Sequence, residues 1–73
     1  MSDFSFEIIK TIGTISELPT GWKKQLTLVK WNGRDPKYDI RDWSADQTKM
    51  RKGVTLDEAE VKSLQKLLLE IGG

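Results

Sequence analysis

The hydrophobic periodicity of this chain changes once, near residue 55, and that change limits the folds available to it. Before residue 55, apolar and polar residues alternate, as they do from Phe4 to Ile8, and this is typical of strands with one buried face. After it, apolar residues recur at the three- and four-residue spacing of one helix face. This stripe consists of Leu56, Val61, Leu64, Leu67, Leu68 and Ile71. The order predicts an α+β fold, an antiparallel sheet followed by one helix that covers one face of it.

Two turns, and a polar and charged loop at residues 44–53, divide the first part of the chain into four expected strands. Pro19 and Gly21 follow the first alternating stretch and indicate a turn. Asn32-Gly33 is a hairpin signal, because both residues tolerate positive φ. The strands are therefore expected at residues 4–15, 22–31, 37–43 and 53–56, the last of them short.

The helix is predicted to begin near residue 56. Thr55 and Glu58 match the capping box, in which the hydroxyl accepts the Glu58 amide N–H and the Glu58 carboxylate reaches back to the Thr55 amide. The glycines at 72 and 73 suit the end of a helix.

The length and composition indicate one small folded domain. Because domains need at least ~50 residues each, 73 residues permit a single domain that spans 1–73. Apolar residues make up 37% and charged residues 32% of the chain, as in folded, soluble proteins. A chain this short buries only about 60% of its unfolded surface, so we expect it to form an oligomer.

Missing residue types narrow the chemistry. The chain has no Cys and no His, so it lacks a thiolate nucleophile, a cysteine zinc site and the usual general base. We therefore predict no enzyme, no metal and no cofactor. The longest wholly apolar run, Leu67 to Leu69, is far below the ~20 residues of a membrane span, and MSDFSFE lacks the pattern of a signal peptide. We expect a cytoplasmic protein with no membrane contact.

The positive charge gathers in the middle of the chain. Residues 21–52 hold nine basic and four acidic residues, a net charge of +5. The remaining residues hold three basic and seven acidic residues, a net charge of −4, so the whole chain carries only +1. The positive field therefore belongs to the two central strands and the loop that follows them.

One face of the predicted sheet combines cations with aromatic rings. If the helix covers Leu26, Leu28 and Ile40, alternation places the opposite set on an open face. This set is Lys23, Gln25, Thr27, Val29, Trp31, Lys37, Asp39, Arg41 and Trp43. Cations can follow the phosphates of a single-stranded nucleic acid, and unpaired bases stack on flat rings at ~1–3 kcal/mol each.

Two other functions fit parts of this pattern. Trp and Arg also dominate protein hot spots, so the open face can be the docking surface of a protein-interaction module. Asp35, Asp39 and Asp42 can in principle hold a divalent ion for phosphodiester hydrolysis, although alternation places Asp39 and Asp42 on opposite faces. Trp22 is out of phase with Trp31 and is interpreted as structural.

Two segments resemble a known family. The run Trp31 to Trp43, WNGRDPKYDIRDW, with residues 49–56, KMRKGVTL, resembles the transcriptional positive cofactor four family of single-stranded-DNA-binding coactivators, and its bacterial YdbC-like branch most closely. The resemblance covers about residues 21–71. It implies a four-stranded curved antiparallel sheet with one C-terminal helix, in a homodimer whose concave surfaces hold single strands.

The resemblance and the open face together predict a binding site. The expected nucleic-acid-binding residues are Lys23, Lys24, Gln25, Thr27, Trp31, Arg34, Lys37, Arg41, Trp43, Arg51 and Lys52. We expect bases to stack on Trp31 and Trp43 while the cations neutralise phosphates. The expected ligand is single-stranded DNA, with RNA as an alternative, bound largely independently of sequence in transcription, replication or repair. Such a protein would be associated with the nucleoid.

Overall fold

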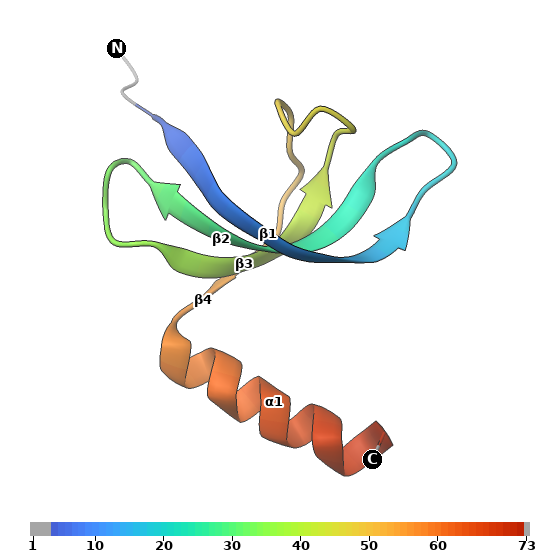
Figure 1. Cartoon of the computed structure of the whole chain (residues 1–73), viewed down its shortest axis with the longest axis vertical. Coiled ribbons are helices and arrows are strands. Elements are labelled where there is room, and N and C mark those ends of the chain that lie inside the picture. Colours follow the sequence, from blue (N-terminus) through green and yellow to red (C-terminus); the bar gives the residue numbers. More distant parts are fainter. Residues whose placement is uncertain (1–3, 73) are drawn as a thin grey trace.

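The computed structural model describes residues 4–72 and confirms the predicted order of elements (Figure 1). Four antiparallel strands form one sheet in the order β1-β2-β3-β4, and one helix follows. The elements are β1 (Phe6–Glu17), β2 (Lys23–Trp31), β3 (Lys37–Trp43), β4 (Val54–Leu56) and α1 (Glu58–Gly72). Gly73, expected at the helix end, lies outside the described residues.

The β2–β3 hairpin forms as its turn residues predict. Asn32 and Gly33 both have positive φ, 50° and 74°. The amide of Arg34 donates to the carbonyl of Trp31 at 2.9 Å and closes the turn. The register then runs from Val29 opposite Lys37 to Lys23 opposite Trp43.

The first strand is interrupted by bulges that the alternating pattern does not predict. β1 pairs with β2 in an antiparallel register that shifts three times, and each shift leaves one isoleucine without a partner on β2. These residues are Ile9, Ile12 and Ile15. Because bulges bend a strand and increase its twist, β1 curves across the sheet instead of running straight. The sheet as a whole curves away from α1, so its concave face is the one opposite the helix (Figure 1).

The segment before β4 passes unusually close to β3. Met50 forms a bridge with Trp43, and Val54 pairs with Ile40. Between these points a Cβ added at Gly53 would lie 2.2 Å from the Cβ of Arg41 and 2.5 Å from the Ile40 carbonyl oxygen. Only glycine lets the two segments approach this closely.

The capping box lies two residues later than predicted. Asp57 Oδ1 accepts a hydrogen bond from the Glu60 amide at 2.8 Å, and the Asp57 amide donates to Glu60 Oε1 at 2.9 Å. The predicted box of Thr55 and Glu58 is therefore wrong. Thr55 belongs to β4, and its hydroxyl donates to the buried carboxylate of Asp39 at 2.9 Å.

The helix lies on the predicted side of the sheet but does not close onto it. Within the described residues, no residue of α1 is buried, and Leu67, Leu69 and Ile71 are exposed. An apolar groove of about 640 Å³ separates the helix from the sheet. Its apolar lining includes Ile15, Leu26, Ile40, Leu56, Val61, Leu64, Leu68 and Leu69. The predicted apolar stripe of α1 is therefore half-buried at Val61 and Leu64 and exposed at Leu67, Leu68 and Ile71 in the single chain.

Candidate nucleic-acid interface

An aromatic cluster occupies part of the concave face. Phe6 lies 6.0 Å from Trp31 and 5.4 Å from Trp43 between ring centroids, and Phe4 lies 6.0 Å from Trp31. Trp31 is half-buried, whereas Trp43 is fully buried. In this conformation Trp43 therefore has no exposed ring surface for a base, and the ring of Phe6 packs against it.

The other end of the concave face is closed by polar contacts. Gln25 donates to Thr14 Oγ1 at 3.1 Å and accepts from Gln47 Nε2 at 2.9 Å, while Gln47 also donates to Thr11 Oγ1 at 3.0 Å. Gln47, with φ of 59°, thus joins the loop after β3 to both β1 and β2. Gln25 and Thr27 are buried, so in this conformation neither side chain presents a surface to a strand on the concave face. Sequence reasoning missed Gln47, because nothing in its local pattern indicates a long-range contact.

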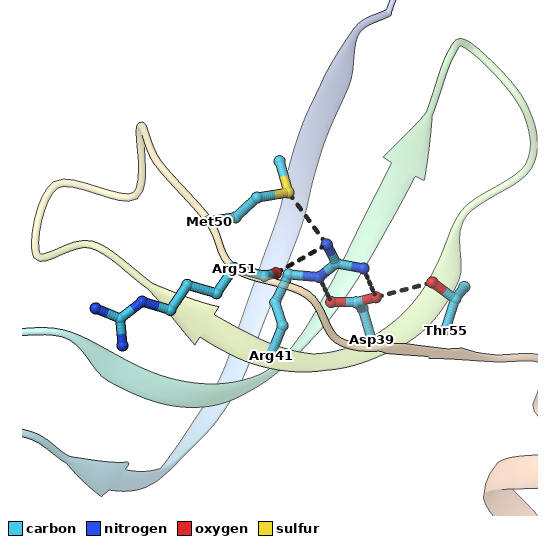
Figure 2. Close-up of polar contacts among 5 residues, drawn as sticks. All are labelled: Asp39, Arg41, Met50, Arg51 and Thr55. Atoms are coloured by element: carbon cyan, nitrogen blue, oxygen red, sulfur yellow. Dashed lines mark hydrogen bonds and ion pairs between the residues drawn. The ribbon is translucent and has the colours of Figure 1, made fainter.

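Arg41 is held by a network of polar contacts (Figure 2). Its Nε donates to Asp39 Oδ2 and its Nη2 to Asp39 Oδ1, the latter at 2.9 Å. Its Nη1 lies 3.2 Å from Met50 Sδ and 3.3 Å from the Arg51 carbonyl oxygen. Asp39 is fully buried and also accepts the Thr55 hydroxyl. Asp39 therefore forms a buried ion pair with Arg41.

This network directs the guanidinium of Arg41 toward Trp31 and not toward solvent. The guanidinium carbon lies 4.7 Å from the centroid of the Trp31 ring, which is a cation–π contact. The Arg41 side chain is 13% exposed and its charge is balanced by Asp39. Arg41 is thus placed to orient Trp31, and its charge is paired within the fold.

The other predicted cations differ in exposure and in whether they form an ion pair with an acidic side chain. Lys23 pairs with Glu17 at 3.4 Å. Arg51 lies 3.9 Å from Asp42 and 4.3 Å from the Trp22 ring centroid, and its side chain points away from Arg41 (Figure 2). The remaining predicted cations are exposed and form no ion pair among the described residues. They are Lys24, Arg34, Lys37 and Lys52, of which Lys24 lies on the helix side of the sheet by alternation.

A small hollow lies next to Trp31. It has a volume of about 310 Å³ and is lined by Phe4, Trp31, Asn32, Arg41 and Thr55. Sequence reasoning predicted Trp31 and Arg41 but missed the other three residues. Asn32 was recognisable only as a turn residue, and Thr55 was assigned to the helix cap.

The loop after β3 is organised around one carboxylate. Asp46 Oδ1 accepts from the Thr48 hydroxyl at 2.7 Å, the Thr48 amide at 3.1 Å and the Ser44 hydroxyl at 2.8 Å. These hydrogen bonds stabilise the ionised form and lower the pKa of Asp46 to about 2. Asp46 therefore stays ionised at neutral pH and fixes the loop that carries Gln47.

The carboxylates that the structure describes do not converge on a metal site. Within residues 4–72, no group of three or more Asp or Glu side chains is placed to hold a metal ion. Asp35, Asp39 and Asp42 therefore do not form the site that the hydrolytic alternative requires.

Within residues 4–72, no helix has the length and apolarity needed to cross a membrane.

A curved four-stranded sheet with a C-terminal helix, an aromatic cluster and exposed cations defines a single-strand-binding class of small α+β proteins. Residues 18–67 match the family model described as Transcriptional Coactivator p15 (PC4). An uncharacterized protein of Treponema pallidum (strain Nichols) is 50% identical over 66 residues, which cover 90% of this chain and 78% of that relative. The chain belongs to the PC4 family, which confirms the positive cofactor four resemblance. Membership supports single-stranded DNA binding of a coactivator-like kind in general terms.

Proposed function

We propose that this protein is a homodimer that binds single-stranded DNA on its concave face, largely independently of sequence. The observation that carries the proposal is the placement of Trp31. It is half-buried, held by Phe4, Phe6 and the guanidinium of Arg41, and it borders a hollow of about 310 Å³. A ring that is fixed in this way offers a stacking surface to an unpaired base.

Exposed cations beside Trp31 supply the phosphate contacts. Arg34 lies in the turn that follows β2, Lys37 begins β3, and Lys52 precedes β4. All three are exposed and free of ion pairs within residues 4–72, so their charge is available to phosphates. Lys23, Lys24 and Arg51 are proposed as outer contacts.

The buried members of the predicted site are proposed to act indirectly. Trp43, Gln25 and Thr27 form the floor on which Trp31 and the loop after β3 rest. Arg41 orients the Trp31 ring. Their replacement is expected to lower DNA affinity by disturbing this floor and not by removing a contact with the strand.

The apolar groove between α1 and the sheet supports the dimer. A chain of 73 residues that leaves Leu67, Leu68 and Leu69 between 53% and 62% exposed gains most by covering them with a second copy. The groove lies on the face opposite Trp31, so dimer formation leaves the concave face open to DNA. The process served is transcription, replication or repair at exposed single strands of the nucleoid, with RNA as an alternative ligand.

A fluorescence titration tests the proposal. The protein is titrated with an oligothymidine of ~20 nucleotides and with a duplex of equal length, at low and at physiological salt. We expect quenching by the single strand only, and an affinity that falls by about 0.7 log unit per log unit of salt for each phosphate contact. Trp31→Ala should weaken binding by ~1–3 kcal/mol.

Trp22→Ala is the matched control, because Trp22 also carries an arginine on its ring but lies at the opposite end of β2. Absence of binding to the single strand would refute the proposal. Binding of a protein ligand with an affinity that does not change with salt concentration would instead favour the protein-interaction module.

A further inference from the structure

The hollow beside Trp31 has room for one base. Its volume of about 310 Å³ is at the lower limit of the ~300–1,000 Å³ that ligand pockets occupy. Phe4 and Trp31 supply aromatic walls, and Asn32, Arg41 and Thr55 supply polar groups. Such a hollow can do more than stack a base, because its polar groups can read the edge of the ring.

Asn32, which lines this hollow, carries two side-chain hydrogen-bond donors. Its Oδ1 accepts from the Ser5 amide at 2.8 Å, and its own amide donates to the Ser5 carbonyl at 2.8 Å. These two bonds fix the side-chain oxygen on Ser5. The Nδ2 group, with its two N–H bonds, has no protein acceptor among residues 4–72 and remains available to a ligand.

One further N–H group belongs to Arg41, which also lines the hollow. A guanidinium has five N–H donors, and four hydrogen bonds of Arg41 are made within the network around Asp39. One donor, on Nη2, is therefore left. The indole Nε1 of Trp31 is buried, so Trp31 contributes its ring to the hollow and not its N–H group.

Acceptors are scarce on the same walls. Asn32 Oδ1 is occupied by Ser5, and Asp39 is fully buried under Arg41 and Thr55. The Thr55 hydroxyl gives its proton to Asp39, which leaves only its lone pairs to face a ligand. The hollow therefore offers several donors and one acceptor.

We propose that this hollow selects thymine over adenine at one position of the bound strand. Thymine presents two carbonyl acceptors, O2 and O4, on either side of one N–H donor, which complements a wall of several donors and one acceptor. Adenine presents an amino donor in place of a carbonyl, so donors would meet donors. The inference rests on the proposed binding of single-stranded DNA and names the base that Asn32 specifies.

Asn32→Asp tests the proposal with almost no change of shape. Asp keeps the oxygen that accepts from Ser5, and it tolerates the left-handed backbone at φ of 50°. It replaces the two N–H donors with an acceptor. The ratio of affinities for oligothymidine and oligodeoxyadenosine of equal length should fall by about tenfold relative to wild type, the discrimination expected for a good paired contact to one base. Comparing this ratio between variants cancels the self-stacking of the adenine strand.

Two companion variants separate the base contact from charge and folding. Arg34→Gln changes the charge of the same turn by one unit, so it should weaken both oligonucleotides equally and leave the ratio unchanged. Asn32→Gly suits the left-handed backbone and removes the donors without adding charge, so it should lower the ratio as Asn32→Asp does. Urea unfolding of each variant establishes that it is folded.

The affinity ratios of the variants decide whether Asn32 selects the base. An unchanged ratio in folded Asn32→Asp and Asn32→Gly would overturn the base selection while the proposed function stands. Equal loss of both affinities in Asn32→Asp would show an effect of charge alone and would overturn it too. If the wild-type protein binds neither oligonucleotide, the proposed function fails together with the inference.

Discussion

Replacing Asp39 with Asn tests the network that orients the binding face. The carboxylate is fully buried and accepts two hydrogen bonds from Arg41 and one from Thr55. Asn keeps the shape but removes the charge, and it turns one acceptor into an NH₂ group that faces a guanidinium N–H. Arg41, whose side chain is only 13% exposed, is then left without its counter-charge.

The expected loss is large for a chain of this size. Removing one partner of a buried ion pair costs ~3–5 kcal/mol, and we expect about 3 kcal/mol here because Arg41 keeps some contact with water. A 73-residue chain has a free energy of unfolding of roughly 4–11 kcal/mol. Asp39→Asn should therefore lower Tm by about 12–24 °C, at ~4–8 °C per kcal/mol for a small domain.

Urea unfolding at one fixed protein concentration measures this loss, because a dimer makes stability depend on concentration. The midpoint should fall with the m value unchanged. Asp42→Asn is the matched control, since Asp42 lies 3.9 Å from Arg51 in a half-exposed pair. Pairs of that kind contribute ~0–1 kcal/mol.

A double-mutant cycle with Arg41→Met shows whether the two side chains interact. If they do, the double variant should lose less free energy than the two single variants together, by about 1–3 kcal/mol. Strict additivity, or a loss below ~0.5 kcal/mol for Asp39→Asn alone, would refute the reasoning.

Three further predictions concern the fold, the loop and the dimer. Gly53→Ala should lower the free energy of unfolding by about 1–3 kcal/mol through overpacking, whereas Gly13→Ala, whose Cβ would meet nothing within 4 Å, should change it little; urea unfolding compares them. An NMR titration of Asp46 should give its lowered pKa of about 2. Its contribution to loop stability is then complete above pH ~4 and is lost as the pH falls toward 2. A pKa at the ordinary value of 3.8 would contradict its hydrogen bonding. Leu68→Glu should convert the proposed dimer to a monomer in sedimentation velocity while Lys66→Glu leaves it intact, and a Leu68→Glu dimer would exclude this groove as the interface.

Local signals predicted most of the fold. The turn at Asn32-Gly33 and strict period-two alternation placed β3 at its observed bounds and β2 within one residue of them. The helical stripe placed α1 within two residues of its start. These features depend on neighbours in the chain, which is why sequence reasoning recovers them.

Long-range contacts account for the errors. The bulges at Ile9, Ile12 and Ile15 depend on how β1 follows a curved partner strand, and no local pattern marks them. The capping box forms at Asp57 and Glu60 because the Thr55 hydroxyl donates to the buried carboxylate of Asp39. Neither effect is visible in a stretch of ten residues.

Alternation predicts the face on which a residue lies but not its depth. Trp31 and Trp43 share the concave face, yet only Trp31 keeps exposed surface, because the curvature of β1 covers Trp43. Arg41 lies on the predicted face as well, but the carboxylate of Asp39 two residues earlier holds its charge. Alternation therefore places these side chains on one face, whereas their burial and pairing depend on contacts that it does not describe.

The placement of the core links stability to binding in this protein. Its fully buried side chains, Thr27, Val29, Asp39 and Trp43, lie on the concave face and not between helix and sheet. A substitution beneath the proposed DNA surface therefore changes folding and binding together. The helix side has the opposite arrangement, since its apolar groove is left open in the single chain and is available to a second copy. A chain too short to build two cores thus builds one under the proposed ligand face, and the proposed dimer would complete the other.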